Sequence, residues 1–195
     1  MANSISKEEL EDLEVTNYND IRDTLESGDL LFASGNYWVS KAIRKVTESP
    51  WSHVGIIFNV RSLDRVLLLE SVEDMGVRFA PLSKYIKDYD GGKPYRGEVV
   101  VARAGGINTD IMNDLARHGI DELTMPYDKD EVAKILARVA MGRGKWKKDR
   151  EYICSELVYE CFDRAGKTFE LDKRGFISPE NIWQDSSVEF LHRVL

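Results

Sequence analysis

Two neighbouring stretches of the chain carry the clearest strand pattern. Residues 52–60 read SHVGIIFNV and residues 66–72 read VLLLESV, and both are rich in β-branched and other apolar side chains. The intervening residues 61–65 (RSLDR) are polar and long enough for a tight link. A turn in the middle of this link pairs Val60 with Arg65. The pattern therefore predicts an antiparallel β-hairpin.

Further strands and helices are indicated by shorter patterns. Strand-like apolar runs occur at residues 29–32, 76–79 and 98–104, and the last of these (EVVVARA) fits a buried strand. Apolar residues three or four positions apart predict amphipathic helices. These helices are expected at residues 37–46, 82–89, 108–119, 130–141 and 154–165, with shorter helical segments near residues 6–15, 20–26 and 178–183. Helices and strands in this mixture predict an α+β fold.

Composition and charge narrow the possible functions. The chain has 195 residues, a net charge of −7 and only two cysteines, Cys154 and Cys161. An acidic chain of this kind argues against sequence-independent binding of nucleic acid. The N-terminus lacks the basic start and apolar core of a secretory signal, and no apolar run approaches the length of a membrane span. We therefore expect a cytoplasmic protein with no integral membrane segment, although export by another route stays open.

Cys154 is the candidate nucleophile. After it, Leu157, Val158, Cys161 and Phe162 form one helical stripe, so Cys154 lies at or near a helix start. Unpaired N–H groups and the helix dipole favour a thiolate there, and the thiolate is the reactive form. A cysteine in an apolar helix is nevertheless more often a small core residue. Cys161, two turns further on, is interpreted in that way and lies too far away for a disulfide.

His53 and Glu70 are the candidate partners of Cys154. In the predicted register, His53 lies opposite Val72 and shares a face of the hairpin with Glu70, within reach of long side chains. An imidazole that takes the thiol proton, oriented by a carboxylate, is the arrangement that thiol catalysis requires. A slip of one residue would separate the two side chains, and both residue types are often merely solvated. The pattern alone does not show that the hairpin meets the Cys154 helix.

Several short blocks resemble a known enzyme family. They are GDLLF at residues 28–32, SHVGI at residues 52–56, Glu70, and YICSELV at residues 152–158. Together and in this order, they resemble the circularly permuted NlpC-type papain-like enzymes, the YiiX-like group, in which the histidine strand precedes the cysteine helix. The resemblance implies a small antiparallel sheet holding His53 and Glu70, packed against the Cys154 helix. A helical extension is expected at residues 1–27 and the catalytic domain at residues 28–195.

The resemblance also implies roles for particular residues. Cys154 would be the nucleophile, His53 the general base and acid, and Glu70 the polar third member. Met125-Pro126-Tyr127 is similar to a block whose tyrosine lies near the oxyanion site, but it lacks the glycine that usually precedes it. Tyr127 is therefore the weaker of these assignments. The implied enzyme needs no cofactor, and no residue cluster has metal-ligand spacing.

The implied function is a cysteine hydrolase that cleaves a peptide, isopeptide or γ-glutamyl-type amide through a thioester intermediate. One alternative is an acyltransferase or esterase acting on acylated lipids, as in the more distant lecithin:retinol acyltransferase-like proteins. Another is a binding domain with an inactive triad.

The basic run at residues 143–150 is either a collar for an anionic substrate or a solvated loop, and His118 and His192 are expected at the surface. The substrate and the oligomeric state are not predicted.

Overall fold

A six-stranded antiparallel sheet forms the centre of the molecule. The computed structural model describes residues 7–36, 40–41, 44–45, 49–127, 153–173 and 175–195. The sheet has the strand order β4-β3-β2-β1-β5-β6. Its strands are β1 (Leu30–Gly35), β2 (His53–Val60), β3 (Arg65–Val72), β4 (Gly76–Pro81), β5 (Gly97–Ala104) and β6 (Val188–Arg193). Every strand pairing is antiparallel.

The predicted hairpin is present with the predicted register. Strands β2 and β3 pair Val60 with Arg65 and Ile56 with Leu69. A short 3-10 helix, η1 (Arg61–Leu63), makes the link, and Asp64 closes it with a left-handed backbone at φ 52°. Asp and Asn are among the few non-glycine residues that adopt this conformation readily. The register keeps His53 and Glu70 on one face.

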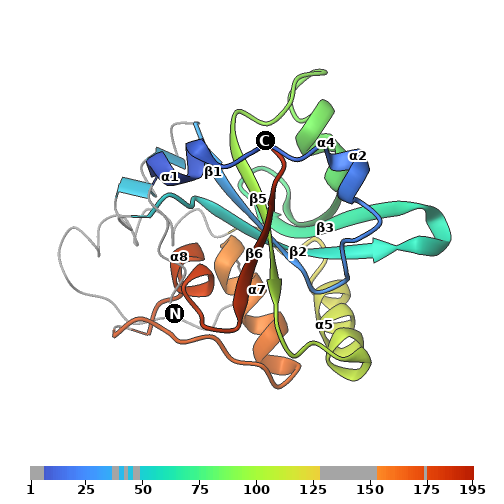
Figure 1. The fold of residues 1–195 in the computed structure, drawn as a ribbon. Coiled ribbons are helices and arrows are strands. Elements are labelled where there is room, and N and C mark those ends of the chain that lie inside the picture. The colour runs from blue at the N-terminus through green and yellow to red at the C-terminus, as the bar shows by residue number, and fades with distance from the viewer. Residues whose placement is uncertain (1–6, 37–39, 42–43, 46–48, 128–152, 174) are drawn as a thin grey trace.

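Helices cover both faces of the sheet (Figure 1). On one side lie α5 (Thr109–Asp121), α7 (Cys154–Arg164) and α8 (Pro179–Trp183). The other side carries α2 (Tyr18–Ile21) and α4 (Leu82–Lys87), while α1 (Lys7–Asp12) lies near the sheet edge. Side-chain oxygens cap three of the described helices, since Asn17 accepts from Asn19 N–H, Asn108 accepts from Ile111 N–H and Ser178 accepts from Asn181 N–H. The α+β class predicted from the sequence is confirmed.

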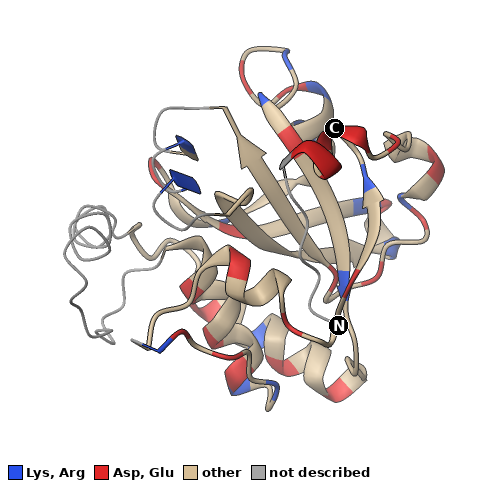
Figure 2. Cartoon of the chain, turned by 60° about the vertical axis from the view of Figure 1, so that its left-hand side comes forward, with Lys and Arg blue, Asp and Glu red and all other residues tan. Residues whose placement is uncertain are grey.

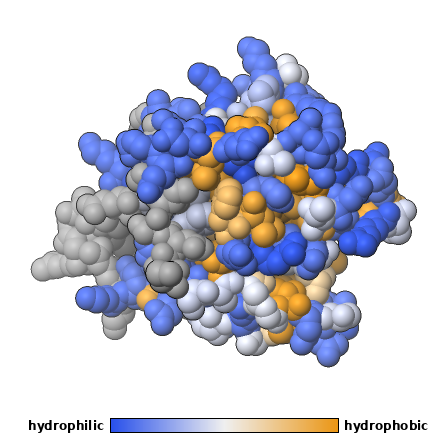
Figure 3. Space-filling model, viewed as in Figure 1, coloured by the Kyte–Doolittle hydropathy of each residue, from blue (hydrophilic) through white to orange (hydrophobic). Residues whose placement is uncertain are grey.

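Alternation along the strands divides the core into two clusters. The α7-side core contains Phe32, Val54 and Ile56 together with Leu157 and the other inward residues of α7. The α4-side core takes the alternate strand residues, among them Leu31, Ile57, Leu68 and Val101, and packs them against Leu82 and Tyr85. Strand β1 is buried along its whole length because it is covered on both faces. On the face seen in Figure 3, mainly hydrophilic side chains surround a smaller area of apolar ones.

Some elements differ from the sequence prediction. The edge strand β6 is absent from the prediction, because its sequence VEFLHR mixes charges into a short apolar run. The N-terminal turn expected at residues 20–26 forms earlier, as α2. The helix predicted at residues 37–46 falls largely outside the described residues, and the one at residues 130–141 falls wholly outside them. The other predicted strands and helices are present, with ends shifted by a few residues.

The surface of the described fold is mixed in charge. Acidic and basic residues are interspersed over helices and strands in Figure 2. None of the described helices has the length and apolar character needed to cross a membrane. The basic run at residues 143–150 lies outside the part of the chain that the structure describes.

Candidate active site

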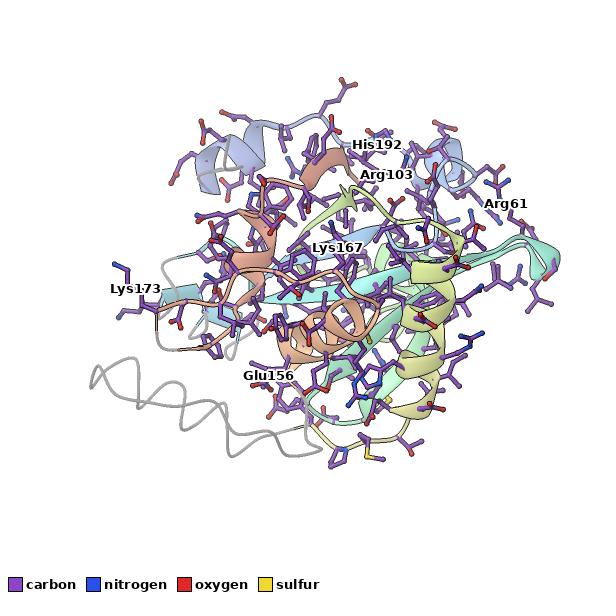
Figure 4. All side chains as sticks on the ribbon, turned by 90° about the horizontal axis from the view of Figure 1, so that it is seen from below. Arg61, Arg103, Glu156, Lys167, Lys173 and His192 are labelled. Carbon is purple, nitrogen blue, oxygen red and sulfur yellow. The ribbon has the colours of Figure 1, made fainter. Side chains whose placement is uncertain are left out.

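Cys154 is the first residue of helix α7. Ile153 before it is extended, at φ −78° and ψ 161°, and its N–H donates to Glu156 Oε2 at 3.2 Å. This is the reciprocal half of a capping box, and Glu156 marks the N-terminal end of α7 in Figure 4. The first N–H groups of a helix have no acceptor within the helix. Cys154 therefore lies where backbone donors and the helix dipole favour a negative charge.

His53 and Glu70 form a buried pair at the end of the hairpin. His53 is the first residue of β2, and its Nε2 lies 2.8 Å from Glu70 Oε2. The side chain of Glu70 is fully buried and that of His53 is 14% exposed. An ionised carboxylate only accepts hydrogen bonds, so Nε2 carries the donated proton. The other ring nitrogen, Nδ1, is left for a second partner.

The thiol of Cys154 lies close enough to the side chain of His53 to interact with it and raise its pKa. By strand alternation, His53 and Glu70 project on the face of the α4-side core, whereas Cys154 packs with the α7-side core. His53 is the first residue of β2, so its ring lies at the end of that strand. There the start of α7, which covers one face of the sheet, comes close to a side chain that projects from the opposite face. Helix α7 also contacts both β2 and β3. The structure thus brings Cys154, His53 and Glu70 together.

The electrostatics of the pair favour an imidazolium. Burial disfavours a charged ring, but hydrogen bonds to the Cys154 thiol and the Glu70 carboxylate outweigh it and raise the pKa of His53 to about 10. Burial likewise disfavours an ionised Glu70. Hydrogen bonding and charge from His53, the charge of Arg78 and the Tyr85 hydroxyl nevertheless bring the pKa of Glu70 below its ordinary value. The arrangement suits a thiolate–imidazolium pair beside an ionised carboxylate.

Two partners of Glu70 were missed by the sequence analysis. Arg78 of β4 is directly opposite Glu70 in the strand register, and its Nε lies 2.9 Å from Glu70 Oε1. Tyr85 of α4 donates its hydroxyl to Glu70 Oε2. A tight turn between the strands at residues 66–72 and 76–79 would have placed Arg78 opposite Glu70. No comparable signal marks Tyr85, because its position depends on how α4 packs on the sheet.

A cleft of about 420 Å³ opens beside His53. Tyr127, the weaker oxyanion candidate, is half-buried and lines this cleft. Most of the lining residues carry a polar group, and seven of their side chains carry a hydroxyl, but the rings of four tyrosines and two aliphatic side chains also face this cleft. The lining residues are Ser40, Ser52, His53, Ser71, Val72, Glu73, Asp74, Met75, Arg78, Tyr85, Tyr89, Tyr95 and Tyr127.

Other candidate residues occupy different environments. The expectation that His118 and His192 are at the surface is wrong for His118, which is 8% exposed between α5 and α7, and His192 is half-buried in β6. Packing of α5 on α7 explains the burial of His118. Cys161 is a free thiol in the core, and burial raises its pKa above the ordinary value. Among the described residues, no group of three or more His, Cys, Asp or Glu side chains is arranged to hold a metal ion.

Comparison with known proteins identifies the family. YiiX of Escherichia coli strain K12, described as uncharacterized, is 28% identical over 141 residues, which cover 72% of this chain and 58% of that protein. The chain thus spans less than two thirds of this relative. A crystal structure described as metalloprotein YiiX from Escherichia coli O157:H7 shares the fold, with a TM-score of 0.64 and 20% identity over 85% of this chain and 96% of the other. Residues 24–189 match the permuted papain-like amidases of the YaeF/YiiX, C92 family, and the chain belongs to that family.

Proposed function

We propose that this protein is a cysteine amidase with Cys154 as its nucleophile. The observation that carries the proposal is the single imidazole of His53 in contact with both the Cys154 thiol and the Glu70 carboxylate. A histidine between a thiol and a fixed carboxylate has the geometry of nucleophilic catalysis. A binding domain with an inactive triad has no need of that arrangement.

The reaction has two steps. The Cys154 thiolate attacks the amide carbonyl carbon and forms an S–C bond, and the His53 imidazolium then gives its proton to the nitrogen as the C–N bond breaks. The amine leaves and a thioester remains on Cys154. Water attacks the thioester carbonyl carbon while neutral His53 takes one of its protons, the C–S bond breaks, and the carboxylic acid leaves as the thiolate–imidazolium pair is restored. Glu70 keeps the ring oriented and stabilises the imidazolium in both steps.

Donors for the developing oxyanion come from the start of α7. The N–H of Cys154 is in the first turn of the helix, so it has no acceptor within the helix and is available to the carbonyl oxygen. Tyr127 is the second candidate donor, since it lines the same cleft as His53. Its assignment rests on that position and on the resemblance of its Pro-Tyr block.

The cleft favours an amide substrate over a lipid ester. Val72 and Met75 are the apolar aliphatic side chains among its lining residues, whereas serine and tyrosine hydroxyls, two carboxylates and Arg78 make up most of the rest. A fatty acyl chain would leave these hydrogen-bonding groups without partners. A peptide, isopeptide or γ-glutamyl group can instead hydrogen-bond with these side chains. The lipid-directed activity of the distant relatives is therefore the weaker alternative.

The proposed chemistry also needs a reduced thiol. Both cysteines are free, and a reducing compartment such as the cytoplasm keeps them so. We therefore extend the proposal to a cytoplasmic amidase that acts on a soluble, peptide-like substrate.

Thiol labelling tests the proposed nucleophile directly. Iodoacetamide at pH 6 is expected to alkylate Cys154 rapidly and Cys161 slowly, because Cys161 is buried with a raised pKa. The variant Cys154→Ser loses the fast labelling, and the matched variant Cys161→Ser in the same helix retains it. Labelling of Cys154 no faster than that of a free thiol would overturn the proposal. A screen of cell-wall muropeptides against acylated lipids then distinguishes amide cleavage from ester cleavage.

A further inference from the structure

Both oxygens of the Glu70 carboxylate are held by side chains outside the proposed triad. Oε1 accepts a hydrogen bond from Arg78 Nε at 2.9 Å, and Arg78 Nη2 forms an ion pair with the same oxygen at 2.8 Å. Oε2 accepts from the Tyr85 hydroxyl and from His53. We propose that Arg78 and Tyr85 are positioning residues of the reaction, which fix the Glu70 carboxylate and keep it ionised so that it orients His53. This inference rests on the proposed amidase function.

The contacts remove the rotational freedom of the carboxylate. Arg78 holds one oxygen through a hydrogen bond and an ion pair, and the Tyr85 hydroxyl holds the other oxygen. Such charge-assisted bonds are stronger than neutral ones and fix geometry as well. With Glu70 fixed, His53 has one favourable orientation, in which Nε2–H donates to Glu70 and Nδ1 is directed to Cys154.

The Arg78 guanidinium is committed to Glu70 and is not a free cation for a substrate. Its Nε and Nη2 bind Glu70, and its Nη1 lies 3.1 Å from the sulfur of Met75. The carboxylate of Glu70 balances its charge, and Glu73 and Asp74 line the same cleft. A substrate anion would therefore meet a neutralised arginine beside two further acids. Arg78 is accordingly placed to act through Glu70.

Burial makes this support necessary. Glu70 is fully buried, and an isolated buried carboxylate takes up a proton at a higher pH than an exposed one. The groups facing Glu70 are His53 from β2, Arg78 from β4 and Tyr85 from α4. Without Arg78, the Glu70 carboxylate loses a neighbouring positive charge and a hydrogen-bond donor. A protonated Glu70 no longer stabilises the imidazolium, and the thiolate–imidazolium pair weakens.

The variant Arg78→Met removes the charge and keeps much of the aliphatic stem. Its matched control is Arg103→Met, because Arg103 also binds a buried carboxylate, that of Asp29, through Nε to Oδ1 at 2.8 Å and Nη2 to Oδ2 at 2.9 Å. Arg103 lies well apart from the Glu156 end of α7 (Figure 4). Each variant loses an arginine that holds a buried carboxylate, but only one of the two carboxylates contacts His53.

The measurement is the pH dependence of Cys154 alkylation by iodoacetamide. The acidic limb is the part of this profile in which the alkylation rate rises with pH. In Arg78→Met, we expect this limb to move to higher pH by about 1 unit or more. In Arg103→Met, it stays at the wild-type position. Arg78→Lys, which restores the charge without the paired N–H groups, returns the limb part of the way. If the acidic limb of Arg78→Met coincides with that of wild type, the inference is wrong. Equal shifts in both methionine variants also overturn it, because they reflect a general loss of stability.

Tyr85→Phe gives a second test that does not depend on the folding of Arg78→Met. It retains the buried ring and removes one donor to Glu70, so the acidic limb moves in the same direction by a smaller amount. The control Tyr18→Phe removes a hydroxyl from another ring of the α4-side core and leaves the limb unchanged. A wild-type Cys154 that reacts like a free thiol at every pH overturns the amidase proposal itself. An activated wild type with unshifted Arg78→Met and Tyr85→Phe variants overturns only the positioning role.

Discussion

His53 Nε2 lies 2.8 Å from Glu70 Oε2, and this contact determines which ring nitrogen faces Cys154. We predict that Glu70→Gln, which keeps the size and removes the charge, weakens the thiolate–imidazolium pair. An ordinary thiol with a pKa of about 8.5 is less than about 1% thiolate at pH 6, so the alkylation rate of Cys154 should fall by about 10²-fold. The rate is measured with iodoacetamide, using mass spectrometry to separate Cys154 from Cys161.

Glu98→Gln serves as the control for this change. Glu98 forms an ion pair with Arg193 at the β5–β6 edge, so the substitution removes a paired carboxylate from the same sheet. Its alkylation rate should match that of wild type. A Glu70→Gln rate equal to that of Glu98→Gln would show that the carboxylate plays no part in activating the thiol.

The raised pKa of His53 predicts a particular titration. Burial favours the neutral ring, but the thiol and the carboxylate raise the pKa to about 10, so the ring stays protonated below that pH and loses its proton above it. In Cys154→Ala one of these contributions is absent, and the midpoint should fall below that of wild type. NMR titration of the His53 ring carbon gives both midpoints. Amide cleavage should decline as the pH rises through about 10, since the imidazolium that protonates the leaving amine is lost.

Gly55 lies on the hairpin face that holds His53 and permits close packing of β2 on β3. A Cβ at Gly55 would lie 2.8 Å from the carbonyl oxygen of Leu69 and 2.9 Å from Leu68 Cδ1. We predict that Gly55→Ala lowers the free energy of unfolding by about 1–3 kcal/mol through overpacking. It should also push the strands apart and lower the His53 midpoint, because the ring moves away from Glu70.

Gly91→Ala is the control for this strain. A Cβ at Gly91 meets no atom within 4 Å, so its cost comes from the backbone φ of +57° alone and is about 1 kcal/mol. Urea unfolding measures both losses, and the His53 titration should change only in Gly55→Ala. A normal titration in Gly55→Ala would mean that the pair tolerates movement of the strands.

Local parts of the site were predictable because local patterns determine them. The hairpin register follows from strand alternation and a short link, so the shared face of His53 and Glu70 could be derived from the sequence. The helix start at Cys154 likewise follows from the apolar stripe of Leu157 and its neighbours. These predictions need only the spacing of apolar residues along each strand or helix.

The long-range parts of the site were not predictable from pattern. Contact between Cys154 and His53 joins segments about a hundred residues apart, and only the resemblance to a family suggested it before the structure was known. Burial of His118 depends on how α5 packs against α7, and the donation from Tyr85 to Glu70 depends on how α4 lies on the sheet. These contacts depend on how side chains of different elements pack together. The spacing of apolar residues within one element carries no information about that packing.

Tyr127 can be tested separately from the triad because an oxyanion donor acts only when charge develops on a carbonyl oxygen. Alkylation by iodoacetamide forms no oxyanion, so Tyr127→Phe should leave the alkylation rate of Cys154 unchanged. Amide cleavage should lose about 10²-fold in kcat with little change in KM, as for removal of one oxyanion donor. The assay uses the muropeptide that the wild type cleaves, with Tyr18→Phe as the control. If alkylation falls together with cleavage, Tyr127 supports the Cys154–His53 pair instead of the oxyanion, and the assignment derived from its position beside His53 in the cleft is wrong.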